Sequence, residues 1–458
     1  ACLETPSMRD KETGSNASLP QNRDMWRIAL PMILSNISVP LLGMVDTGVT
    51  GHLESPVYLG AVAIGAMIFS FLYTGVNFLR MGTTGIAAQS FGADDNDGLR
   101  VSLGQALIVA LLIAFTLIAL QVPLGHFAMQ LLGGDAETQR YALEYFSIRI
   151  WSAPGTLANY ALIGWFIGLQ NARVPLLIFL TINITNIALD LIFVLGLGMK
   201  VDGVALASVF AEYSGLAVGS AFAVSALRRR EGHWPLARLV NISAYRAFFS
   251  VNANLFMRTI ALVFTLGFVT AQGARLGGLV LAANAVLMNF QNLTAFGLDG
   301  LAHAAEALVG KAIGQRRRDA LEEAVRLTLK WSLIFSLGFT LAYLLAGPLI
   351  IRILTDLPDV RETAMRYLPW MIASPLVSVW CFLYDGVYVG ATRAREMRNI
   401  MFVSTLFVFL PAWYFLQPLH NDGLWLAFLL FMASRGIGMH IGYRKTVLPM
   451  VLRDDEQR

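Results

Sequence analysis

The feature that most constrains this chain is a succession of long apolar segments that begins near Trp26 and continues almost to the end. A helix of about 20 apolar residues spans the hydrocarbon core of a membrane, and each of these segments is at least about that long. Of the 458 residues, 56% are hydrophobic and 14% are charged, whereas soluble proteins average roughly 25% charged residues. The sequence therefore predicts an all-α polytopic membrane protein.

Twelve of these segments are predicted transmembrane helices. They cover residues 26–50, 57–82, 99–122, 138–168, 173–197, 203–227, 246–272, 279–309, 319–346, 361–390, 396–418 and 423–448. Residues 1–25 are polar and contain no apolar stretch of the kind found in a signal peptide, so they are predicted to be a disordered tail. Residues 451–458 are predicted to be a second tail.

Basic residues in the short loops predict the orientation of the chain. The loops after the sixth, eighth and tenth predicted helices are rich in arginine and lysine, and the alternate loops are poor in them. Basic loops remain on the cytoplasmic side of a membrane. Both termini are therefore predicted to be cytoplasmic, in a cell inner membrane. The net charge of +4 follows from this bias, and no nucleic-acid partner is expected.

The sequence is internally duplicated. The stretch "GWFIGLQNAR" at 164–173 returns as "GVYVGATRAR" at 386–395, and "DGVALA" at 202–207 returns as "DGLWLA" at 422–427. The nearly constant offset predicts two pseudo-symmetric six-helix lobes, an N-lobe at 26–227 and a C-lobe at 246–450, joined by a cytoplasmic linker at 228–245. Two parallel repeats about a central cavity suit alternating access.

Ionisable side chains occur inside the predicted helices, where a charge is costly and usually faces a cavity or a partner. They include Asp46, Arg80, Arg149, Asp190, Glu212, Arg258, Asp299, Glu306, Asp385 and Arg435.

Five polar residues of the first half are predicted to form one layer in the outer half of the membrane. At about 1.5 Å per helical residue, Asp46, Tyr145, Asp190 and Ser208 reach that depth. Asn186 lies one turn from Asp190 on the same helix face. Two carboxylates in one desolvated site share a proton near neutral pH. Asp46 is therefore interpreted as a proton-binding or cation-binding group.

The alternative for Asp46 is a structural one, since Gly48 shortly after it indicates that the helix is about to end and the carboxylate would then anchor the helix end. Pro31 and Pro40 precede Asp46 in the same predicted helix. Each proline removes a backbone hydrogen bond, so both are predicted hinges.

The acids of the second half are Asp299, Glu306 and Asp385. They are secondary candidates for a binding site. Structural ion pairs with Arg258 or Arg435 are the favoured interpretation for them.

Several stretches resemble the multidrug and toxic compound extrusion (MATE) family. They are "PMILSNISVPLLGMVDTGVTGHL" in the first predicted helix, "AAQSFGA" closing the second and "NITNIALD" in the fifth, together with the doubled six-helix plan. "FLRMGTTGIAAQSFGA" and "GATRAREMRN" are similar to its bacterial DinF-like branch. The resemblance implies twelve helices arranged as a V. It also implies export of amphipathic, often cationic compounds against an inward H⁺ or Na⁺ gradient.

The resemblance also implies roles for individual residues. Asp46 matches the coupling acid of the first helix, and Pro31 matches its kinking proline. The other implied site residues are Tyr145, Asn186, Asp190 and Ser208, where some relatives have threonine in place of the serine. Asn159 is the neighbouring candidate for an amide of the fourth helix.

We therefore expect a proton-coupled multidrug efflux antiporter that works by alternating access and is not an enzyme. Its partners would be small amphipathic drugs or dyes and membrane lipids, and it would act as a monomer without a cofactor. One alternative is Na⁺ coupling, with the ion at Asp46, Asp190 and Asn186. Another is a flippase for lipid-linked sugars, which the acidic layer disfavours. An intramembrane aspartyl protease is also disfavoured, because the chain lacks a GxGD motif after Asp385.

Overall fold

A computed structural model of the chain describes residues 18–50, 55–132, 135–241 and 245–451. Within these ranges, the side chains of residues 39–47, 49–50, 56, 131–132, 236 and 240 are not described. Every regular element in the described ranges is a helix.

The helices of the first half follow the predicted spans closely. They are α1 (Asn22–Thr50), α2 (Pro56–Val76), α3 (Phe78–Gly92), α4 (Asn96–Ala119), α5 (Gln121–Leu132), α6 (Ala136–Arg149), α7 (Ala153–Gly168), α8 (Arg173–Asp190), its π-helical extension η2 (Leu191–Gly196) and α9 (Val201–Arg228).

The second half begins with a short helix in the predicted linker. Its helices are α10 (Leu236–Val240), α11 (Tyr245–Arg275), α12 (Gly278–Gly314), α13 (Arg318–Leu354), α14 (Pro358–Gly390), α15 (Ala394–Val403), the π-helical η4 (Ser404–Phe409), α16 (Leu410–Leu416) and α17 (His420–Gly442).

Helical segments occupy all twelve predicted spans, but within the described ranges nine helical stretches are individually long and apolar enough to cross a membrane. Two of the predicted spans lie in one continuous helical stretch, Ala394–Val451. A 3₁₀ turn at Ile150–Ser152 divides another span into α6 and α7. The short helices α5 and α10 were not predicted. Pro123 lies near the start of α5, where its missing N–H favours a break from α4.

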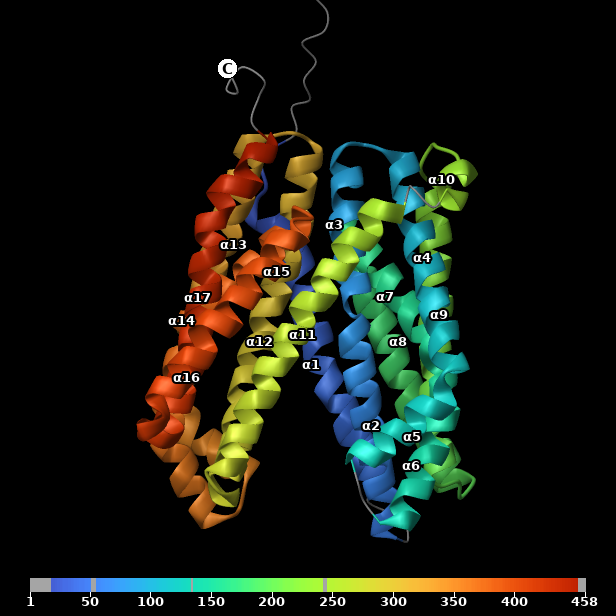
Figure 1. Cartoon of the computed structure of the whole chain (residues 1–458). Coiled ribbons are helices and arrows are strands. Elements are labelled where there is room, and N and C mark those ends of the chain that lie inside the picture. Colours follow the sequence, from blue (N-terminus) through green and yellow to red (C-terminus); the bar gives the residue numbers. More distant parts are fainter. Residues whose placement is uncertain (1–17, 51–54, 133–134, 242–244, 452–458) are drawn as a thin grey trace, which may run out of the picture.

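The helices form two bundles that meet at one end (Figure 1). Helices α2 to α9 make up one bundle and α12 to α17 the other, while α11 runs diagonally between them. The bundles lie close together at the end where α1 begins, and they diverge toward the opposite end. Helix α1 packs against α8 of the first bundle and α12 of the second.

The outer surface is strongly apolar, as expected for a chain surrounded by lipid. Large hydrophobic side chains are among the most exposed in the described ranges, including Leu345 at 81%, Phe415 at 76% and Ile353 at 75%. A soluble protein rarely exposes contiguous apolar surface on this scale. The chain is a multi-pass membrane protein.

The backbone repeats the duplication found in the sequence. Asp94 and Arg316, 222 residues apart, have φ angles of 52° and 54°, and Gln170 and Thr392, also 222 apart, have φ angles of 59° and 54°. Each of these residues follows the end of a long helix, where a left-handed residue commonly stops helical hydrogen bonding. The two halves therefore end equivalent helices in the same way.

Glycines bring the equivalent helices α3 and α12 into backbone contact. A Cβ atom on Gly92 of α3 would clash with the carbonyl oxygen of Lys311, and a Cβ atom on Gly314 of α12 would clash with that of Gln89. Gly92 corresponds to Gly314 and Gln89 to Lys311 at the repeat offset of 222. The contact is therefore the same from both sides, as a two-fold pseudo-symmetry axis between the bundles requires.

Candidate functional site

Helices α1 and α8 pack side by side and run in the same direction. Arg27 near the start of α1 and Arg173 at the start of α8 line the same pocket, so both helices begin at the same end of the molecule. Farther along, the Nδ2 atom of Asn183 in α8 donates a hydrogen bond of 3.3 Å to the carbonyl oxygen of Ser38 in α1. The two helices therefore stay side by side over at least ten residues.

This pairing places the backbones of the two predicted coupling acids at one level. Asp46 is eight residues beyond Ser38, and Asp190 is seven residues beyond Asn183. At about 1.5 Å per residue, these separations are about 12 Å and 10 Å along parallel helices. The side chain of Asp46 lies outside the described residues, so its contacts and its coupling role stay predictions.

Asp190 occupies a fully buried position at the end of α8, with a relative exposure of 0%. Asn186, one turn earlier, is also buried, and its Nδ2 atom donates a 3.4 Å hydrogen bond to the Oγ atom of Ser208 in α9. After Asp190 the helix continues as a π-helical turn, a local deformation that is frequent at functional sites. The structure thus gathers three of the predicted site residues between α8 and α9.

Asn159 holds a second carboxylate next to this cluster. Its Nδ2 atom donates hydrogen bonds to the Oε2 atom of Glu212 at 3.0 Å and to the carbonyl oxygen of Glu212 at 2.9 Å. Glu212 lies one turn beyond Ser208 on α9. Its only signal in the sequence was a charge within an apolar span, and its role next to Asn159 was not predicted.

Tyr145 lies in an aromatic cluster of the same bundle and is fully buried on α6. Its hydroxyl oxygen accepts a hydrogen bond from Nη1 of Arg149, whose guanidinium group lies 5.2 Å from the ring centroid of Phe69. Gly65 of α2 has no side chain and leaves room for the tyrosine ring. A connection from Tyr145 to Asp190 stays a prediction.

Helix α1 is continuous across both predicted hinges. Pro31 has no N–H group for the carbonyl oxygen of Arg27, and its own carbonyl oxygen accepts a 2.8 Å hydrogen bond from the Oγ atom of Ser35. The side chain of Pro40 lies outside the described residues. The hinge function of both prolines stays a prediction.

Ion pairs account for two of the three acids predicted in the second half. Asp385 accepts a 2.8 Å hydrogen bond from Nη2 of Arg435 and another from Nη2 of Arg258, so it makes the expected structural pair with both cations. Within the described ranges, no ion pair joins Asp299 to either arginine. For Asp299 the favoured ion-pair interpretation is wrong.

Glu306 also makes a structural ion pair, but its partners are not the predicted Arg258 or Arg435. Its Oε2 atom lies 3.3 Å from Nη1 of Arg80 in α3, and its Oε1 atom lies 3.3 Å from Nδ1 of His303. Because glycines allow α3 and α12 to pack closely, Arg80 of the first bundle reaches Glu306 of the second.

Comparison with known proteins identifies the same two halves of the chain. The family model described as MatE matches residues 31–192 and again residues 254–414, one match in each half. The chain belongs to the MatE family. It is therefore a membrane transporter and not an enzyme.

Individual MatE relatives are similar over nearly the whole chain. The DNA damage-inducible protein F of Escherichia coli K12 is 42% identical over 424 residues, covering 93% of this chain and 92% of that protein. The multidrug resistance protein NorM of Vibrio parahaemolyticus is 23% identical, covering 91% and 94%. The solved outward-facing structure of a multidrug resistance MATE family transporter has a TM-score of 0.82 at 18% identity, covering 94% of this chain and 96% of that one. This last match confirms the MATE fold.

Proposed function

We propose that this transporter exports amphipathic, often cationic drug-like compounds in exchange for H⁺. The names of NorM and of the outward-facing transporter, which refer to multidrug resistance, support this class of cargo. The observation that carries the proposal is the fully buried carboxylate of Asp190 beside the amide of Asn186 and the hydroxyl of Ser208. A buried carboxylate in a polar layer is suited to bind either a proton or a cation.

The cationic cargo and protons compete for the acidic layer, and this competition sets the direction of exchange. When Asp46 and Asp190 are deprotonated, their charge attracts a cationic cargo molecule. When protons bind from the outside, the charge is neutralised and the cargo leaves. An inward H⁺ gradient keeps the outside more acidic, so protonation occurs on the side where the cargo is released.

Alternating access would come from motion of the N-lobe (26–227) against the C-lobe (246–450) about the linker at 228–245. The bundles converge at one end and diverge at the other (Figure 1), which is the arrangement expected for a carrier open to one side. With both termini cytoplasmic, as the basic loops predict, the open side faces outward. Each chain contains both lobes, so one monomer is sufficient for transport.

The test is dye efflux from proteoliposomes in which a pH gradient and a Na⁺ gradient are imposed separately. We expect the pH gradient alone to drive efflux. Asp46→Asn and Asp190→Asn should each reduce the rate at least about tenfold, the effect of about 1.4 kcal/mol on a free energy. Asp356→Asn is the control, because Asp356 is fully exposed in a loop.

Two results would contradict the proposal. Efflux driven by Na⁺ but not by the pH gradient would assign Na⁺ as the coupling ion. Parental rates in both Asp46→Asn and Asp190→Asn would exclude the acidic layer from coupling.

A further inference from the structure

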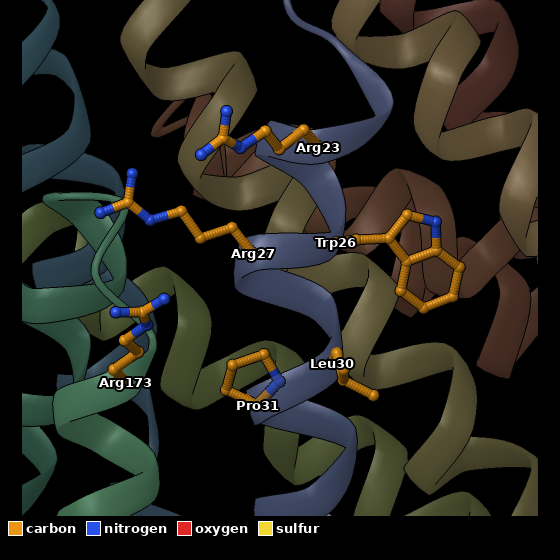
Figure 2. Close-up of a pocket in the computed structure, with 6 residues that line it drawn as sticks. All are labelled: Arg23, Trp26, Arg27, Leu30, Pro31 and Arg173. Carbon is orange, nitrogen blue, oxygen red and sulfur yellow. The ribbon is translucent and has the colours of Figure 1, made fainter.

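Two adjoining pockets at the end of the molecule where α1 begins are lined by arginine and are separate from the acidic layer. The first has a volume of about 560 Å³ and lies beside α1 and the start of α8. Figure 2 shows the guanidinium groups of Arg23, Arg27 and Arg173 extending to the same side of α1, into the space between α1 and α8. Pro31 and Leu30 lie one turn farther into the membrane-spanning part.

The second pocket adjoins the first, because Arg27 lines both. It also has a volume of about 560 Å³, and it adds Arg229 and Arg230 at the end of α9. Among the described residues, no acidic side chain lines either pocket. In the part of the chain that the structure describes, the side chains of Arg23, Arg27, Arg173 and Arg229 make no ion pair.

This arrangement favours an anion as the ligand. The five guanidinium groups that line these adjoining pockets repel one another, and negative charge between them would relieve that repulsion. Gln170, which lines the second pocket, has a buried Nε2 atom without a hydrogen-bond acceptor in the described part of the chain. Guanidinium groups match the geometry of phosphate oxygens with paired hydrogen bonds. The chemistry therefore favours a phosphate-bearing ligand.

Exposed apolar side chains continue from the arginines along the same helix faces. At 3.6 residues per turn, positions four, seven and eleven residues after an arginine share its face. Counting from Arg23, the last two of these positions are the exposed residues Leu30 and Leu34. Counting from Arg173, all three are exposed apolar residues, Leu177, Leu180 and Ile184. Because α1 and α8 pack side by side, a basic crevice opens onto an apolar surface that runs toward the centre of the membrane.

We propose that this crevice is a binding site for one anionic phospholipid, with its phosphate among Arg23, Arg27 and Arg173 and its acyl chains along α1 and α8. A free phosphate ion shares the headgroup chemistry, but it would leave the exposed leucine and isoleucine faces unused. In the orientation proposed above, the lipid belongs to the cytoplasmic leaflet, where basic pockets between transmembrane helices bind anionic headgroups. The site is independent of the exchange mechanism.

Native mass spectrometry of the full-length protein tests the proposal. The protein is purified in detergent with equal amounts of phosphatidylglycerol and phosphatidylcholine, and the lipids retained after delipidation are counted. We expect one phosphatidylglycerol to be retained in preference to phosphatidylcholine. A second sample receives 10-fold more inorganic phosphate than lipid, and phosphate should not displace the phosphatidylglycerol. Equal retention of the two lipids, or displacement by phosphate, would overturn the proposal.

Matched variants locate the site. Arg27→Gln/Arg173→Gln should weaken phosphatidylglycerol retention at least about tenfold, since each basic side chain contributes separately to anionic lipid binding. Arg395→Gln/Arg398→Gln, at the start of α15 and outside the lining of either pocket, should leave it unchanged. Arg27→Lys/Arg173→Lys keeps the charge and should retain the lipid more strongly than the glutamine variant. If the glutamine variant does not fold, the lysine variant replaces it as the test. The lysine variant is then expected to retain phosphatidylglycerol more weakly than the parent protein does. Parental retention in the pocket variant, or equal loss in the control, would overturn the assignment.

Discussion

The Nη1 atom of Arg80 in α3 lies 3.3 Å from the Oε2 atom of Glu306 in α12, so a buried ion pair joins the two bundles. The side chains are only 11% and 4% exposed, and Nδ1 of His303 lies 3.3 Å from the same arginine and from the same carboxylate. The bundles cannot separate at this end without breaking the pair.

Removing the carboxylate should therefore be costly. Glu306→Gln leaves Arg80 without a compensating charge in a buried position, which typically lowers stability by about 3–5 kcal/mol. We expect a clear drop in the thermal unfolding midpoint of the detergent-purified protein. Glu322→Gln is the control, because its pair with Arg318 is half exposed and such pairs contribute about 0–1 kcal/mol. Equal midpoints for the two variants would mean that the pair does not hold the bundles together.

The glycine contact between α3 and α12 gives a second prediction. Gly314→Ala places a methyl group against the carbonyl oxygen of Gln89, and overpacking of this kind costs about 1–3 kcal/mol. The unfolding midpoint should fall. Gly267→Ala lies within α11, where no described atom comes within 4 Å of the Cβ position, and it should instead raise stability by about 0.5–1 kcal/mol. Shifts of the same sign in both variants would argue against a close helix contact.

Substitution of Asp385 distinguishes a structural ion pair from a ligand-binding role for this residue. Asp385→Asn leaves the guanidinium groups of Arg258 and Arg435 without their carboxylate, so a structural role predicts a loss of about 3–5 kcal/mol. Asp385→Asn/Arg435→Gln should recover part of that loss, because one uncompensated charge is also removed. Thermal unfolding and dye efflux are measured together. Loss of efflux at an unchanged midpoint would instead indicate a ligand-binding role.

Local features of the sequence predicted much of the fold. The apolar spans and the repeat are visible because length, hydropathy and the offset of 222 residues are properties of the chain itself. The neighbourhood of Asn186 and Asp190 follows from helical spacing. These predictions required no knowledge of how the helices pack.

Contacts between distant helices could not be predicted in this way. Arg80 and Glu306 are 226 residues apart, and Asn159 and Glu212 are 53 apart. Each acid was recognisable as a charge inside a span, but several arginines and amides were available as partners. The choice among them depends on which helices meet, and it is set by small residues such as Gly92 that have no hydrophobic signal of their own.

The hydroxyl group of Ser208 gives the most direct test of the proposed polar layer. It accepts a 3.4 Å hydrogen bond from Asn186, one turn from Asp190. Ser208→Ala removes that acceptor, and loss of about 1 kcal/mol of hydrogen bonding should slow proton-driven dye efflux about fivefold. Ser208→Thr keeps the oxygen and should retain the parental rate.

Ser214→Ala is the matched control on the same helix. The Ser214 hydroxyl bonds to Thr185 and to the carbonyl oxygen of Ala211, and it makes no hydrogen bond to Asn186 in the described part of the chain. Its removal should leave efflux unchanged at equal protein amounts. If Ser208→Ala and Ser214→Ala transported at the same rate as the parent, the Ser208 hydroxyl would have no part in exchange, and the coupling layer would have to be sought among the carboxylates alone.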